Sequence, residues 1–311
     1  MRRGWFLVVA VLAACSGGSA ARPAPLTTTS TVAAACTPSR PAPPAGAHTF
    51  AFNGASRSYL LAIPPDYDGR AAYPLVFVFH GFASNGPASD ENTSMGAKGA
   101  ARGYVVVTPT SDPPEWTLFT DPSRVDDYAF VLALAADVQT QLCIDPARVY
   151  AAGHSNGSAF AGFLVCKAPY VFAAVAMVSA TVPSTCPDGI APSALAIAGT
   201  ADPQVPYAGG TVGGSTIGIP AATDTVAAYV THYHCAPDAV KDTPLAGVER
   251  ARYSGCVAGA DVVLDTIVSG THPWPGSLAA IADPSDSDAG HRFDATSEIL
   301  DFFDDHRRPP S

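Results

Sequence analysis

A serine flanked by glycines, in the stretch AAGHSNGSAF at residues 151–160, constrains this chain more than any other short segment. A short apolar run ends just before Ser155, and an apolar pattern of helical length begins just after it. A tight turn between strand and helix strains the backbone, so the residues two positions away must be nearly free of side chain. Gly153 and Gly157 meet this requirement. The alternative is a small residue in a glycine-rich loop, and the placement between a strand and a helix favours a nucleophile.

The remaining pattern predicts strands that alternate with helices. Apolar, β-rich runs predict strands at 73–81, 104–110, 147–153, 172–180, 193–199 and 260–270. Helical spacing predicts helices at 93–102, 126–142, 156–168, 221–234 and 294–306. Residues 48–64 predict two strands joined at Asn53-Gly54. We therefore expect an α/β fold: a mostly parallel central sheet with helices on both faces and an N-terminal antiparallel hairpin.

A serine hydroxyl is a weak nucleophile that needs a base oriented by an acid. Hydrolases with this turn supply them in the chain order serine, acid, histidine. Asp202 follows the strand at 193–199, and its alternative role is to form a turn before a proline. Of the five histidines beyond Asp202, His272 alone lies on a loop just past a predicted strand, where the alternative is a surface histidine. The sequence therefore predicts Ser155, Asp202 and His272 as catalytic residues.

Acyl transfer also requires two donors for the developing oxyanion. The backbone N–H of Asn156, the residue after the serine, is one expected donor. The other is expected from the loop after the strand at 73–81, most simply from the N–H of Phe82. His80 and Gly81 would shape that turn, and His80 is also a candidate substrate contact.

Composition excludes several other classes of function. The formal net charge is −10, and basic pairs occur only near the ends of the chain, so we expect no nucleic-acid partner. No glycine-rich phosphate loop and no C-x-x-C zinc pattern is present. The segment HYHC at 232–235 is interpreted as the surface of a helix end. We expect no metal and no cofactor.

The N-terminus predicts export. Residues 1–15 carry two arginines and then an apolar segment too short to span a bilayer, and Cys15 ends this segment as in a lipoprotein signal. Ordinary secretion with cleavage near residues 18–20 is the alternative. Residues 16–46, rich in Ala, Thr and Pro, predict a disordered tether, and residues 47–308 the catalytic domain. The expected location is the cell envelope, anchored in a membrane by the lipid, or the medium.

Six further cysteines in an exported chain indicate disulfide bonds. Cys235 and Cys256 are the expected pair, because they bracket one short excursion before the last strand. Sequence does not choose among the connectivities of the other four, which are Cys36, Cys143, Cys166 and Cys186.

Several stretches, in order, resemble the polyhydroxybutyrate depolymerase and feruloyl esterase group of secreted α/β-hydrolases. They are RSYLLAIPPDYD, PLVFVFHGFASN, VDDYAFV, IDPARVYAAGHSNGSAFAGFLVC, FAAVAMVSA, IAGTADPQVPY, THPWPG and ATSEILDFFDDH, spread over residues 48–306. The resemblance implies an α/β-hydrolase fold and the same three catalytic residues. It makes Trp274 a candidate substrate contact. The chain departs from the group at Ser158, where a glycine is frequent, at Phe82, where a cysteine is frequent, and before His272, where a run of glycines is usual.

The resulting hypothesis is a serine esterase that needs no cofactor and works through an acyl-enzyme. Its substrate would be a hydroxyalkanoate ester, a feruloyl or acetyl ester on a polysaccharide, or a generic short-chain ester. Two alternatives stay open at this point. One is an acyltransferase that passes the acyl group to an envelope sugar, and the other is a binding lipoprotein without catalysis on the same scaffold.

Overall fold

The computed structural model describes residues 35–118, 126–183 and 186–309. The predicted signal segment at 1–15 with Cys15, and most of the predicted tether at 16–46, lie outside the described residues. Within the described part of the chain, no helix is long and apolar enough to cross a membrane.

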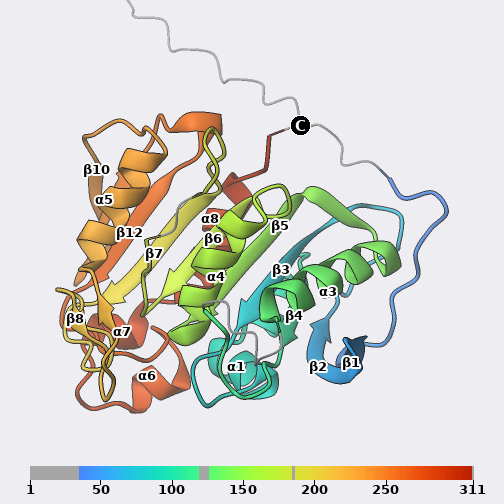
Figure 1. Cartoon of the computed structure of the whole chain (residues 1–311), viewed down its shortest axis with the longest axis horizontal. Helices are drawn as coiled ribbons and strands as arrows, with labels where there is room; N and C mark the ends of the chain where they lie inside the picture. The colour runs from blue at the N-terminus through green and yellow to red at the C-terminus, as the bar shows by residue number, and fades with distance from the viewer. Residues whose placement is uncertain (1–34, 119–125, 184–185, 310–311) are drawn as a thin grey trace, which may run out of the picture. The chain divides into compact units, whose positions relative to one another are not determined.

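Ten strands of the described chain form one twisted sheet in the order β1-β2-β4-β3-β5-β6-β7-β12-β11-β10 (Figure 1). The run from β4 to β12 is parallel, and the strands at both edges pair antiparallel. The strand bounds are β1 Gly46–Phe52, β2 Ala55–Ala62, β3 Tyr73–Phe79, β4 Val105–Pro109, β5 Ile144–His154, β6 Ala174–Val178, β7 Ser193–Gly199, β10 Val240–Leu245, β11 Val248–Tyr253 and β12 Val262–Ile267. Strands β8 (Gly210–Thr211) and β9 (Gly218–Ile219) pair separately.

Helices cover both faces of this sheet. Figure 1 shows α3, α4 and α5 over one face and α8 behind the other. The helix bounds are α1 Gly86–Thr93, α2 Met95–Ala101, α3 Asp127–Gln141, α4 Asn156–Lys167, α5 Ala222–His232, α6 Leu278–Ala282, α7 Asp288–Arg292 and α8 Ala295–Asp305, with a 3-10 turn at Val257–Gly259. The predicted α/β architecture is therefore confirmed.

The alternation of side chains along β3 explains why its sequence reads as one continuous apolar run. Leu75, Phe77 and Phe79 point into the core under α3, α4 and α5. Val76 and Val78 point into the second core, which α2 and α8 cover. All five side chains are fully buried, as expected for a strand covered on both faces.

The N-terminal hairpin is confirmed, and its turn follows from its residues. Asn53 and Gly54 both have positive φ, 48° and 79°, which glycine and asparagine adopt most readily. The short helix expected at 93–102 corresponds to α2, and a further helix that the sequence did not indicate, α1, precedes it. Asn85 caps α1 through Ala88 N–H, and Ser94, at φ 54°, separates α1 from α2.

The excursion before the last parallel strand is itself a β-hairpin, β10–β11, which the sequence did not indicate. Cys235 and Cys256, the expected pair, are joined at its base. The other four cysteines form two more disulfides, Cys36–Cys143 and Cys166–Cys186. The first of these ties the start of the described chain to the beginning of β5.

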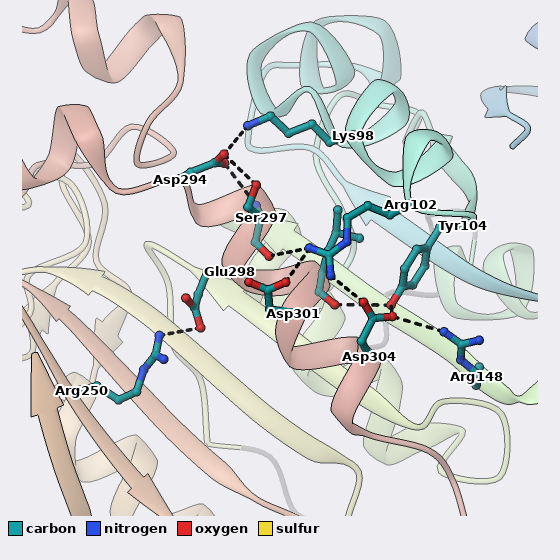
Figure 2. Close-up of polar contacts among 11 residues, drawn as sticks. Lys98, Arg102, Tyr104, Arg148, Arg250, Asp294, Ser297, Glu298, Asp301 and Asp304 are labelled. Atoms are coloured by element: carbon teal, nitrogen blue, oxygen red, sulfur yellow. Dashed lines mark hydrogen bonds and ion pairs between the residues drawn. The ribbon is translucent and has the colours of Figure 1, made fainter. Parts of the chain in front are cut away.

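Ion pairs fasten α8 to the strands and helix beside it, as Figure 2 shows. Asp304 accepts hydrogen bonds from Arg102, which follows α2, at 2.5 Å, from Tyr104 at 2.6 Å and from Arg148 of β5 at 3.3 Å. Lys98 of α2 bonds Asp294, the residue that caps α8, at 2.6 Å. These contacts join residues that are 156 to 202 positions apart in the sequence.

Another arginine drawn in Figure 2, Arg250, forms a more deeply buried pair. Arg250 of β11 faces Asp265 of β12 across the sheet and donates two hydrogen bonds of 2.7 Å to its carboxylate. Asp265 is fully buried, and Glu298 of α8 contacts the same guanidinium at 2.5 Å. Burial raises the pKa of Asp265, and Arg250 pulls that pKa back down. The arginine thus lets a carboxylate remain charged inside the sheet.

Replacing Arg250 by leucine should lower the free energy of unfolding by about 3–5 kcal/mol, because a buried carboxylate loses its partner. Without the arginine the pKa of folded Asp265 rises further above its unfolded value. The loss relative to wild type should therefore be smallest near about pH 4 and grow as the pH rises, since more charge must be buried. Urea unfolding of wild type and Arg250→Leu at about pH 4 and at neutral pH measures both the loss of stability and its dependence on pH.

Arg292→Leu is the matched control, since Arg292 and Asp288 form an exposed pair at 3.3 Å. Such a pair contributes about 0–1 kcal/mol. Equal losses in the two variants, or a loss independent of pH in Arg250→Leu, would contradict this assignment.

Candidate active site

The turn between β5 and α4 holds Ser155 in a strained conformation. Its backbone has φ 54° and ψ −120°, outside the regions that L-residues favour. A Cβ on Gly153 would collide with the backbone of Gly157, and one on Gly157 would collide with the carbonyl oxygens of Phe79 and His80. Gly157 therefore lets the turn pass close to the end of β3, and Gly153 lets the end of β5 pass close to the first turn of α4.

The side chains of Ser155, His272 and Asp202 form one hydrogen-bonded chain. His272 Nε2 lies 3.0 Å from Ser155 Oγ, and His272 Nδ1 lies 2.7 Å from Asp202 Oδ2. Asp202 Oδ1 accepts the backbone N–H groups of Gln204 and Val205 at 2.8 and 2.9 Å, so both carboxylate oxygens are engaged. The histidine and the aspartate are 6% and 7% exposed. This arrangement can move a proton from the hydroxyl to the imidazole.

Adjacent parallel strands bring the acid and the histidine together. Strands β7 and β12 pair in register, with Ile267 beside Gly199, so the loops after them leave the same edge of the sheet. Backbone hydrogen bonds join these loops, from Thr200 N–H to Ile267 at 3.0 Å and from Ala201 N–H to Gly270 at 2.9 Å. Parallel pairing of β7 and β12 thus brings Asp202 and His272 together, although they are 70 residues apart in the sequence.

The residue before the histidine is anchored from a third segment. Thr271 N–H donates to Asp286 at 2.9 Å, and its hydroxyl donates to Asp283 at 3.0 Å. Both aspartates lie in the connection between α6 and α7, a segment separate from β7 and its loop. The backbone that carries His272 is therefore held from two directions.

The segments that carry the two expected oxyanion donors, Asn156 and Phe82, adjoin Ser155. Asn156 is the first residue of α4, so its N–H has no acceptor within the helix, and the helix N-terminus carries partial positive charge. A Cβ on Gly81 would lie 3.5 Å from the Cβ of Ser155, so the backbone just before Phe82 lies close to this serine. The Phe82 side chain is 66% exposed beside them.

His80 was predicted as a substrate contact, and its burial corrects this. The side chain has no exposed surface. Its Nδ1–H donates to Gly81 O at 2.8 Å, and its Nε2 accepts the N–H of Ser111 at 3.0 Å. Burial lowers the pKa of His80, which keeps the ring neutral and this pattern intact. With both nitrogens engaged, His80 supports the Gly81–Phe82 loop from inside.

Trp274, the other predicted substrate contact, is also buried, at 1% exposure. Its indole N–H donates to the hydroxyl of Thr296 at 3.0 Å, and its ring meets that of His154 edge-on at 6.3 Å. The tryptophan therefore packs beneath the His272 loop, and its surface does not reach the substrate side. The sequence showed that this residue follows the histidine, but it did not show which way the ring turns.

Sequence reasoning missed two contacts of the turn itself. The Asn156 side chain, considered only for its backbone, accepts the N–H of Trp116 at 2.7 Å, and the Trp116 indole donates to His80 O at 3.0 Å. His154, in the GHSNG motif, donates from Nε2 to His272 O at 2.9 Å. The polar residues at the two variable positions of G-x-S-x-G were the available signal.

No cluster of three or more metal-ligating side chains occurs among the residues that the structure describes. A cavity of about 440 Å³ lies at the opposite, N-terminal ends of the parallel strands. It is lined by residues such as Phe172, Ile190 and His306, and none of Ser155, Asp202 and His272 lines it. The candidate site is therefore located by its chemistry at the C-terminal edge of the sheet, where open α/β sheets bind ligands.

Comparison with known families now places the chain. The family model for esterase PHB depolymerase matches residues 57–222, which is more than half of the sequence and includes the Ser155 turn and Asp202. The chain belongs to the esterase PHB depolymerase family. The sequence-based resemblance to this group is thereby confirmed.

Proteins named as feruloyl esterases are among the relatives of this chain. A probable feruloyl esterase C of Aspergillus niger is 32% identical over 160 residues, 50% of this chain and 58% of that protein. Feruloyl esterase C of Emericella nidulans is 28% identical over 208 residues, 64% of this chain and 71% of that protein. The first match thus spans less than two thirds of the relative's length.

Solved structures share the fold. Acetyl xylan esterase from Aspergillus awamori superimposes with a TM-score of 0.57 at 12% identity, over 83% of this chain and 99% of that one. A thermostable esterase gives a TM-score of 0.55 at 17% identity, over 84% and 63%. With the strand order described above, these similarities confirm the predicted α/β-hydrolase fold.

The Ser155 turn lies so close to the end of β3 that adding a single methyl group at Gly157 should disturb the fold. Gly157→Ala should lower the free energy of unfolding by about 1–3 kcal/mol or prevent folding, because its Cβ meets the backbone of Phe79 and His80. Gly218→Ala is the control, since a Cβ there meets nothing within 4 Å. Urea unfolding of both variants tests this, and a fully stable Gly157→Ala protein would contradict it.

Proposed function

We propose that this protein is a serine carboxylic-ester hydrolase in which Ser155, His272 and Asp202 form the catalytic triad. One observation carries the proposal: a serine on a strained strand–helix turn lies 3.0 Å from a histidine whose other nitrogen lies 2.7 Å from a buried aspartate. Membership of an esterase family supports the same reading.

In this mechanism His272 Nε2 takes the proton from Ser155 Oγ as the oxygen attacks the ester carbonyl. The tetrahedral intermediate collapses, the C–O bond to the alcohol breaks, and His272 returns the proton to the leaving alkoxide. Water, activated by the same nitrogen, then hydrolyses the acyl-enzyme to the free acid. Asp202 holds the imidazole with Nδ1–H toward it and stabilises the positive charge that forms during each transfer.

The oxyanion is held by the backbone N–H groups of Asn156 and Phe82. Support comes from the free first turn of α4 and from the contact of Gly81 with the serine. Asn156 also fixes the segment around Trp116 through its side chain, so both donors belong to backbone that is held before substrate arrives.

The substrate class proposed is a carboxylic ester with a small or aromatic acyl group. The names of the relatives favour feruloyl esters, and the family description favours hydroxybutyrate esters. Methyl ferulate, p-nitrophenyl esters of increasing chain length and a polyester film separate these possibilities. Product analysis with an added alcohol acceptor separates hydrolysis from acyl transfer.

Ser155→Ala should lower kcat for p-nitrophenyl acetate by about 10⁴-fold or more and abolish labelling by a fluorophosphonate, since no other oxygen takes its place. Asp202→Asn should lower kcat by about 10⁴-fold while labelling becomes slow. Ser215→Ala, which changes an exposed loop serine, is the control and should react like wild type. Labelling that persists in Ser155→Ala would reject the proposed nucleophile.

Export with lipidation at Cys15 is part of the same proposal. Three disulfides in the described chain support an oxidising compartment outside the cytoplasm. In a bacterial host, a clickable fatty-acid analogue should label the wild-type protein and Ser16→Ala, and it should not label Cys15→Ala. Absence of label on the wild-type protein would exclude the anchor and leave ordinary secretion.

A further inference from the structure

His154 connects the nucleophile to the base by a contact outside the triad. It is the last residue of β5 and directly precedes Ser155. Its Nε2 lies 2.9 Å from the backbone oxygen of His272. A carbonyl oxygen can only accept, so His154 Nε2 carries the proton and donates it. The residue before the nucleophile therefore holds the backbone of the residue that deprotonates it.

The ring of His154 fills the space between three parts of the site. Its centroid lies 5.1 Å from that of His272, and Trp274 meets it edge-on. On the other side, a Cβ on Gly81 would lie 3.3 Å from His154 Nδ1. The base loop, the oxyanion loop and the buried tryptophan thus all contact one imidazole.

The chemistry of this ring suits a fixed neutral donor. Burial lowers the pKa of His154 to about 4, and the neighbouring His272 ring also lowers this pKa. The hydrogen bond from His154 to His272 O raises the pKa, as does the charge of Asp202, but these effects do not cancel the decrease. At neutral pH the ring therefore carries a proton on Nε2 only. A second cation beside His272 would oppose the imidazolium that forms in each proton transfer, and a neutral ring avoids this repulsion.

We propose that His154 is a positioning residue, which fixes the main chain of His272 so that its imidazole stays within hydrogen-bond distance of Ser155. The inference rests on the proposed function of the same site. It does not make His154 a catalytic residue, because the ring exchanges no proton with substrate. Its effect is to limit how far the loop after β12 can move away from the loop after β5.

The donated hydrogen bond separates this role from simple space filling. His154→Gln retains an N–H donor at a similar distance from the backbone, whereas His154→Leu and His154→Phe fill the space without a donor. Without the donor, the His272 carbonyl is no longer held, and the His272 imidazole can move by a fraction of its 3.0 Å distance to Ser155 Oγ. Displacements of this size at a reacting group lower the rate by about 10- to 100-fold.

The test measures kcat and KM for p-nitrophenyl acetate, and the rate of fluorophosphonate inactivation, in the full-length protein. His154→Leu and His154→Phe should each lose about 10- to 100-fold in kcat and in inactivation rate with little change in KM. His154→Gln should recover most of the loss. Thermal unfolding shows which variants fold. If one of the two donor-free variants fails to fold, the other is compared with His154→Gln.

Equal activity of His154→Gln and the donor-free variants would overturn the inference, whether all are impaired or all are active. A rise in KM at constant kcat would also overturn it, because that points to substrate binding. These outcomes differ from failure of the proposed function, in which Ser155→Ala would keep its activity and its label.

Discussion

The close passage of one turn over a neighbouring strand is the constraint on which the site depends. Between β5 and α4 the backbone passes so close to the end of β3 that Gly157 has no room for a Cβ, and Gly153 has none because the first turn of α4 lies against it. Ser155 N–H bonds Val178 O in β6 at 2.9 Å, so the turn is also fixed on its other side. A strained residue costs about 1–3 kcal/mol and persists only where its surroundings fix it. Here two flanking strands do so.

Parallel pairing then determines what the serine can meet. Because β7 and β12 run side by side in the same direction, their following loops converge at the edge where the turn presents its hydroxyl. Backbone hydrogen bonds between the two loops reduce the number of ways in which His272 and Asp202 can be arranged. The hydrogen-bonded chain from hydroxyl to carboxylate is in this sense a product of strand order, since a different order would place the same three residues apart.

Strand ends could be read from the sequence because they depend on short-range patterns. Glycines around Ser155, the apolar run before Asp202 and the strand before His272 were all visible, and they predicted which side chains share an edge. The hairpin β10–β11 was not visible, because β10 is largely exposed and shows no apolar alternation. Its position depends on Arg250 pairing with the buried Asp265, a contact that no local pattern predicts.

The orientation of aromatic rings was beyond sequence reasoning for a related reason. The rings of His80 and Trp274 point inward, toward hydrogen-bond partners on Ser111 and Thr296. These partners come from distant segments of the sequence, so local patterns could not predict the orientation. Periodicity reports which face of a strand is buried, and it does not report a loop residue's rotamer. Residues adjacent to a reacting group in the sequence are therefore poor guides to what touches the substrate.

The same kind of hydrogen bond, from a ring N–H to a backbone carbonyl oxygen, holds both loops beside Ser155. The Gly81–Phe82 loop is fixed where the Trp116 indole donates to His80 O at 3.0 Å, and the His272 loop where the His154 imidazole donates to His272 O at 2.9 Å. Neither carbonyl belongs to a strand of the sheet, so ladder hydrogen bonds do not fix it. Ring donors suit this task, because a planar side chain with two rotatable bonds loses little entropy when packed. Loops that leave a sheet can thus be held by side-chain donors in place of ladder hydrogen bonds, and the proposed proton transfer over 3.0 Å requires such fixed positions.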